Sequence, residues 1–148
     1  MLKIGIIGYG NLGKGVEAAL SHTPDMELVA VFTRRDPNSL HIHSANVPVL
    51  PYDQFAEHDI DVMILCGGSA TDLPGMTPEV AANCNVVDSF DNHADIPKHF
   101  AAVDAAAKQS GKLALISAGW DPGLFSINRL YGASILPNGS DDTFWGRG

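Results

Sequence analysis

The sequence predicts an α/β protein built on one doubly wound parallel sheet. Short apolar runs alternate with amphipathic segments along the 148 residues, which is the pattern of repeated strand–helix–strand units. The runs are rich in Ile, Val and Leu with little alternation, as expected for strands covered by helices on both faces. The length suits one domain with a single core.

Five apolar runs are expected as strands, and four longer segments between and after them as helices. The strands are Leu2–Ile7, Leu28–Thr33, Val62–Cys66, Val86–Asp88 and Leu113–Ser117. The helices are Leu12–Ser21, Pro74–Asn83, Pro97–Ser110 and Pro122–Leu136. Residues 34–60 are the least regular, where "PVL" predicts an extra strand and "YDQFAEH" one helical turn.

The ends of these helices carry the expected signals. Asn11, Asp72 and Asp121 stand where a side chain can cap a helix N-terminus. Gly111 follows the third helix as a C-terminal stop. Each of the last three expected helices begins with a proline, a residue that suits the first helical turn: Pro74, Pro97 and Pro122.

The charge balance excludes two classes of partner. The formal net charge is −8, whereas nucleic acids and anionic membranes are bound through clustered Lys and Arg. No segment approaches the length of a membrane-spanning helix. We therefore expect no nucleic-acid partner and no membrane association.

The cysteines and histidines suggest neither a disulfide nor a metal site. Cys66 lies in an apolar run far from Cys84, so free thiols in a reducing cytoplasm are expected. The six histidines lack neighbouring carboxylates or thiols that would complete a ligand set, so no metal is predicted.

A glycine motif follows the first expected strand. In "GYGNLG", Gly8, Gly10 and Gly13 have the G-x-G-x-x-G spacing, which allows a tight turn, close approach of a pyrophosphate, and close helix–strand packing. The phosphates would lie at a helix N-terminus. This context favours a Rossmann-type dinucleotide site over a glycine-rich turn without ligand.

The end of the second strand favours NADP(H) over NAD(H). An acidic residue about 20 positions after the glycines binds the ribose of NAD, but here Thr33 is followed by Arg34 and Arg35. Guanidinium groups bind a 2′-phosphate that a carboxylate would repel. Asp36 could pair with either arginine, and two solvated surface arginines remain the alternative.

The end of the next strand adds "CGGSATDLP" to the expected cofactor site. Gly67 and Gly68 let a ribose or nicotinamide pass close to the backbone, and Ser69 and Thr71 supply hydroxyls. Asp72 is expected to cap the helix that follows.

The last two strand ends are acidic and aromatic. "VVDSFDNHADIP" contains Asp88, Asp91 and Asp95, of which Asp95 is placed to start a helix. "SAGWDPG" contributes Trp120 and Asp121. Because strand ends of a parallel sheet share one edge, these residues predict a pocket for a cationic substrate, such as one with an ammonium group.

Six segments in chain order resemble those of the meso-diaminopimelate dehydrogenase family. They are "GYGNLGKGVE", "FTRRDP", "CGGSATDLP", "DSFDNHADIPKH", "SAGWDPGLFSINR" and "TFWGRG". The resemblance implies NADP-dependent, reversible oxidative deamination of the D-centre of meso-2,6-diaminopimelate to L-2-amino-6-oxopimelate and ammonia, on a route to lysine and cell-wall precursors.

The resemblance also implies residue roles. Asp91 and Asp121 would be catalytic carboxylates that hold the reacting amino group, and Trp120 and Trp145 would form walls of the substrate site. Cofactor roles are implied for Gly8, Asn11, Leu12, Arg34, Arg35, Ser69, Ala70 and Thr71.

Family members are much longer and build a second domain for dimerisation and substrate contacts. The resemblance implies that residues 1–148 are the NADP-binding domain and that 137–148 lead towards this further domain. "FWGRG" departs from the family's usual FWGPG at Arg147. We expect a homodimer for the complete protein and little or no activity for the 148 residues alone.

Two alternatives remain open. One is another NADP-linked amino-acid or semialdehyde dehydrogenase with the same domain. The other is a non-catalytic module that binds NADP.

Overall fold

The structure is a computed structural model that describes residues 1–136 and 138–139. It divides into two compact units, Met1–Ala118 and Gly119–Gly148.

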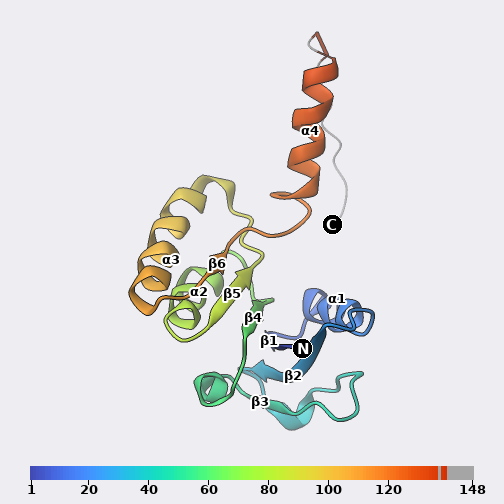
Figure 1. Cartoon of the computed structure of the whole chain (residues 1–148), viewed down its shortest axis with the longest axis vertical. Helices are drawn as coiled ribbons and strands as arrows, with labels where there is room; N and C mark the ends of the chain where they lie inside the picture. Colours follow the sequence, from blue (N-terminus) through green and yellow to red (C-terminus); the bar gives the residue numbers. More distant parts are fainter. Residues whose placement is uncertain (137, 140–148) are drawn as a thin grey trace. The chain divides into compact units, whose positions relative to one another are not determined.

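The first unit contains a parallel sheet in the order β3-β2-β1-β4-β5-β6, with all pairings parallel (Figure 1). This confirms the predicted doubly wound sheet. Because the chain order reverses on the two sides of β1, a crevice is expected beyond the carboxyl ends of β1 and β4. The strands are β1 (Leu2–Ile7), β2 (Met26–Thr33), β3 (Val49–Pro51), β4 (Val62–Leu65), β5 (Asn85–Asp88) and β6 (Ala114–Leu115).

Helices cover both faces of this sheet. Consecutive strand residues point to opposite faces, so Ile6 packs in the apolar cluster with Val16 of α1, and Ile7 in the cluster with Val80 of α2 and Val103 of α3. This two-sided burial explains why the strands are apolar without alternation. The helices of this unit are α1 (Asn11–Leu20), α2 (Leu73–Ala81) and α3 (Ile96–Ser110).

Short 3₁₀ turns connect several of these elements. They are η1 (Pro37–Ser39), η2 (Tyr52–Glu57) and η3 (His93–Asp95). The strand β3 and the turn η2 confirm the two elements expected in the irregular region 34–60. The edge strand β6 is shorter than predicted, and its Leu115 is exposed.

The second unit contains α4 (Leu124–Ile135). The expected start of this helix at Pro122 is wrong, because Gly123 has a φ of +148°, outside the helical range. Asp121 therefore does not cap α4: Gly123 takes the N-cap position, and the Asp121 carboxylate accepts a hydrogen bond from Ser126 Oγ at 2.8 Å.

Of the other two expected caps, Asn11 is wrong and Asp72 is confirmed in position alone. Asn11 is the first residue of α1, and Gly10 holds the N-cap position. Asp72 holds the N-cap position of α2, but its side chain makes no capping hydrogen bond. In contrast, Gly111 ends α3 in the left-handed conformation that was expected.

Candidate functional site

The glycine turn after β1 has the geometry of a phosphate-binding loop. Gly8 has a φ of +89°, and a Cβ on Gly13 would lie 2.4 Å from Gly8 O. A Cβ on Gly10 would meet nothing within 4 Å. The N-cap residue of α1 is Gly10, which has no side chain to cap the helix, and the uncapped N–H groups of a helix N-terminus favour an anion.

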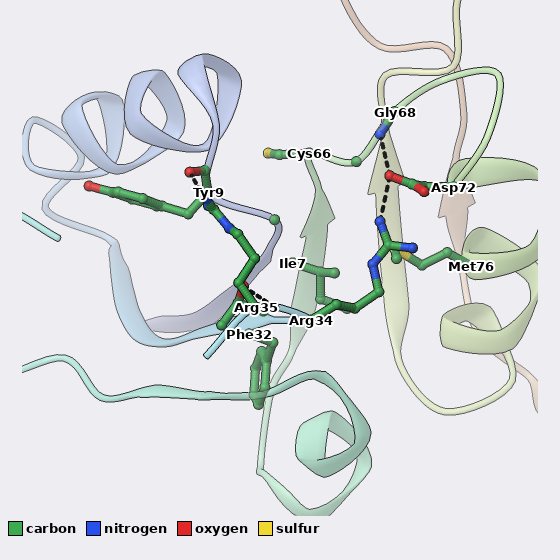
Figure 2. A pocket seen from close by; sticks show the side chains of 12 residues that line it. Ile7, Tyr9, Phe32, Arg34, Arg35, Cys66, Gly68, Asp72 and Met76 are labelled. Carbon is green, nitrogen blue, oxygen red and sulfur yellow. Dashed lines mark hydrogen bonds and ion pairs between the residues drawn. The ribbon is translucent and has the colours of Figure 1, made fainter. Parts of the chain in front are cut away.

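A cavity of about 440 Å³ lies at the carboxyl ends of β1, β2 and β4 (Figure 2). It lies beside the glycine turn, where the chain order of the sheet reverses and where a dinucleotide is expected. Its lining residues are Ile7, Gly8, Tyr9, Phe32, Thr33, Arg34, Arg35, Cys66, Gly67, Gly68, Asp72 and Met76.

Both predicted arginines line this cavity. Arg35 donates a hydrogen bond from Nη2 to Tyr9 O at 3.0 Å, and its backbone N–H donates to Thr33 Oγ1 at 3.1 Å. Arg34 crosses the cavity to Asp72 (Figure 2). Asp36 caps η1 through Asn38 N at 3.0 Å. Thr33 thus fixes the backbone that presents the arginines.

Asp72, expected as a cap, is part of the cavity wall. Its Oδ2 accepts from Gly68 N at 2.9 Å and lies 2.7 Å from Arg34 Nη2, and its Oδ1 accepts from Thr71 Oγ1 at 3.3 Å. The hydrogen bond from Gly68 N, together with that from Arg34, lowers the pKa of Asp72 below its usual value. Arg34 and Asp72 are 38 positions apart in the sequence. Because a capping role alone accounted for Asp72, nothing in the sequence predicted this ion pair.

A buried pair that the sequence did not reveal lies beneath the glycine turn. Tyr9 donates a hydrogen bond from its hydroxyl to Glu17 of α1, which also accepts from Ser44 N at 2.7 Å. Burial, and then this carboxylate, raise the pKa of Tyr9 to about 12. Burial raises the pKa of Glu17, but the hydrogen bonds from Tyr9 and Ser44 outweigh it and lower the pKa overall. The pair anchors the loop after β2 to α1.

The expectation that Asp88 faces a cationic substrate is wrong. The residue is 1% exposed. Its Oδ2 accepts from Thr77 Oγ1 at 2.8 Å and lies 2.6 Å from His99 Nε2. Its Oδ1 accepts from Phe90 N at 3.1 Å and from Ser117 N at 2.8 Å. A carboxylate with this many donors holds together the ends of β5 and β6 and two helices.

Asp91, unlike Asp88, is exposed. Its backbone N–H donates to Ser69 Oγ at 2.8 Å, which joins the predicted cofactor loop 69–71 to the predicted substrate loop. Ala70 and Thr71 follow in that cofactor loop, and Ala70 lines a second cavity with Asn92 and Asp95. The serine hydroxyl was predicted to contact cofactor, and its bond to Asp91 N is an additional structural role.

The remaining predicted substrate residues belong to the second unit. Trp120 is 64% exposed and stacks on Phe125 with ring centroids 5.7 Å apart. Trp145 and Arg147 lie outside the described residues. The proposed joint action of Asp91 and Asp121 stays a prediction.

Both cysteines are free thiols, as predicted. Burial raises the pKa of Cys66 to about 12, so this thiol in the cavity wall stays protonated at neutral pH. Within residues 1–136 and 138–139, no cluster of three or more His, Cys, Asp or Glu could hold a metal ion. No helix in this same part of the chain is long and apolar enough to cross a membrane.

The parallel sheet, the glycine turn and the cavity at the reversal of strand order define a Rossmann-type domain of the dinucleotide-binding class. Comparisons with known proteins show which dinucleotide-binding proteins this chain is similar to. The chain is 63% identical over 149 aligned residues to the meso-diaminopimelate D-dehydrogenase of Ureibacillus thermosphaericus, covering 99% of this chain and 45% of that protein.

Solved structures agree with this similarity. The C. glutamicum diaminopimelate dehydrogenase in complex with diaminopimelate matches with a TM-score of 0.83 and 45% identity, covering 98% of this chain and 44% of that one. An engineered D-amino acid dehydrogenase bound to NADP⁺ matches with a TM-score of 0.82 and 45% identity, covering 92% and 42%.

A family model described as the diaminopimelic acid dehydrogenase C-terminal domain matches residues 119–148. The chain is therefore similar to meso-diaminopimelate D-dehydrogenases over nearly its whole length, as its sequence predicted. It spans about 45% of the length of these relatives.

Proposed function

We propose that this chain is the NADP(H)-binding part of a meso-diaminopimelate dehydrogenase. The reaction converts meso-2,6-diaminopimelate, water and NADP⁺ to L-2-amino-6-oxopimelate, an ammonium ion, NADPH and a proton. The observation that carries the proposal is the pair Arg34 and Arg35 in the wall of the cavity beside the glycine turn. The similarity to diaminopimelate dehydrogenases supports the choice of substrate.

The cavity suits NADP(H) in three respects. The open space at Gly10 admits a pyrophosphate, and the N-terminus of α1 attracts it. The two guanidinium groups favour a 2′-phosphate, and the last residue of β2, where NAD(H)-binding domains have a carboxylate, is the neutral Thr33. We expect Gly8, Gly10, Asn11, Leu12 and Gly13 to hold the pyrophosphate. Ser69, Ala70 and Thr71 are expected to border the ribose and nicotinamide.

The bound cofactor supplies the hydride acceptor, and the residues of this chain bind and orient the substrate. Asp91 and Asp121 would accept hydrogen bonds from the ammonium group at the D-centre. Trp120 and Trp145 would exclude water from that centre and limit its orientations. For the complete protein we also expect a homodimer and a cytoplasmic location.

Cofactor binding by the 148-residue chain tests the proposal directly. NADPH and NADH are titrated separately, with nicotinamide fluorescence or calorimetry as the measurement. Replacing Arg34 and Arg35 together by Ala should weaken NADPH binding by about tenfold to a hundredfold, the range for losing charge-assisted hydrogen bonds. The affinity for NADH, which lacks the 2′-phosphate, should change little.

A matched control replaces Arg129 of α4, which lies outside the cavity lining, with Ala. This variant should bind both cofactors as the parent chain does. Equal losses of NADPH and NADH affinity in the double arginine variant would contradict the 2′-phosphate site. No binding of either cofactor by the parent chain would contradict the proposed function.

A further inference from the structure

An acidic side chain is paired with one of the two arginines that are proposed to bind the 2′-phosphate. Asp72 lies at the start of α2, and its Oδ2 is 2.7 Å from Arg34 Nη2. Figure 2 shows the Arg34 side chain reaching from the end of β2 to this carboxylate. The guanidinium proposed to bind the 2′-phosphate therefore already has an anionic partner.

The position of this carboxylate is fixed independently of Arg34. Asp72 also accepts from Gly68 N at 2.9 Å and from Thr71 Oγ1 at 3.3 Å, and its side chain is only 17% exposed. The Arg34 side chain is 58% exposed. Of the two partners, the arginine is thus the one that is free to reorient.

The Asp72 carboxylate is charged at neutral pH, as an ordinary Asp is, and the backbone N–H of Gly68 and then Arg34 lower its pKa further. A phosphate dianion that binds Arg34 must therefore replace this carboxylate as the partner of the guanidinium. Arg35 is held differently, because its guanidinium donates to the carbonyl oxygen of Tyr9.

We propose that Asp72 lowers the selectivity of this site for NADP(H) over NAD(H) by competing with the 2′-phosphate for Arg34. The inference rests on the proposed function, because it needs NADP(H) in this cavity. When NADP(H) binds, Arg34 exchanges the Asp72 carboxylate for the 2′-phosphate. Asp72 is a specificity-determining residue that acts through Arg34.

Replacing Asp72 with Asn separates its hydrogen bond with Gly68 N from its charge-based pairing with Arg34. An amide oxygen can still accept from Gly68 N, so the loop is retained while the negative charge is removed. NADPH should bind roughly two- to fivefold more tightly, the range for releasing a partly exposed ion pair. NADH affinity should be unchanged. The probes 2′,5′-ADP and 5′-AMP should repeat this difference without a nicotinamide.

Two controls isolate the competition. Asp53→Asn makes the same charge change at an exposed site outside the cavity lining and should alter neither affinity. In a chain that carries Arg34→Ala, the further change Asp72→Asn should leave NADPH affinity nearly unchanged, because the shared partner is absent.

Three outcomes would overturn the inference while leaving the proposed function intact. The first is an unchanged NADPH affinity in Asp72→Asn. The second is an equal gain in affinity for NADPH and for NADH in that variant. The third is a gain in NADPH affinity from Asp72→Asn that is the same in the Arg34→Ala chain as in the parent chain. Failure of the parent chain to bind any of the four probes would instead overturn the proposed function, and this inference with it. Circular dichroism and thermal unfolding confirm that each variant is folded before titration.

Discussion

At the scale of single residues, Asp88 and Asp91 show how similar carboxylates acquire different roles. Both follow the same apolar run, and the sequence alone assigns both to a cationic substrate. Asp88 is the last residue of β5 and points into the protein, where four hydrogen-bonding groups surround it. Asp91 lies beyond the strand and is exposed. The difference depends on Thr77, His99 and Ser117, whose proximity to Asp88 only the folded chain creates.

Replacing Asp88 with Ala should destabilise the protein by about 3–5 kcal/mol, because it leaves a buried network without its acceptor. The measurement is urea-induced unfolding of the parent and variant chains. The control is Asp104→Ala, which removes a carboxylate paired with Lys108 on the surface of α3 and should change stability by less than about 1 kcal/mol. A loss at Asp88 as small as that control would contradict the structural role.

At the scale of elements, the sequence predicted strands better than helix ends. The strand β1 could be predicted in full, because an apolar run buried on both faces depends only on its own composition. The caps at Asn11, Asp72 and Asp121 could not, because a capping residue has other possible partners. The Asp72 carboxylate instead accepts from Gly68 N in the preceding loop and pairs with Arg34, which lies far away in the sequence.

The same contrast applies to the candidate site. The glycine turn is local in sequence, so its role follows from the spacing of Gly8, Gly10 and Gly13 within one strand–turn–helix segment. The hydrogen bond between Ser69 and Asp91 N joins loops 22 positions apart. Such contacts depend on the order of strands in the sheet, which the local sequence does not encode.

The helix α1 offers a matched pair of glycine substitutions. Replacing Gly13 with Ala should destabilise the protein by about 1–3 kcal/mol, since its Cβ would lie 2.4 Å from Gly8 O and force the turn to shift. Gly15→Ala, where a Cβ meets nothing within 4 Å, should instead stabilise the helix by about 0.5–1 kcal/mol. Thermal unfolding of both variants measures the difference.

NADPH titration extends this comparison to the site. Gly13→Ala should weaken binding, because the shifted turn moves the N–H groups at the start of α1. Gly15→Ala should bind as the parent does. If both variants had the same stability and affinity, the close contact between Gly13 and Gly8 would have no role in the turn.

At the scale of the whole molecule, cofactor binding and turnover are expected to separate. The cavity, both arginines and the glycine turn lie in Met1–Ala118, so this unit holds every residue proposed to bind NADP(H). The proposed substrate residues are divided: Asp91 lies in the first unit, and Trp120 and Asp121 lie in the second. The relatives devote more than half of their length to further sequence.

We therefore expect the 148-residue chain to bind NADPH but to show little or no diaminopimelate dehydrogenase activity. The measurement is diaminopimelate-dependent formation of NADPH, followed by the absorbance of the reduced nicotinamide. A matched control is the chain fused to the part of the U. thermosphaericus relative that follows the aligned region, which is 63% identical to this chain; this fusion should show turnover. In that fusion, Asp91→Asn should lower kcat/KM by about tenfold or more, because a charge-assisted hydrogen bond to the ammonium is lost. Rates in the 148-residue chain equal to those of the fusion would show that binding and catalysis need no further sequence, contrary to the division proposed here.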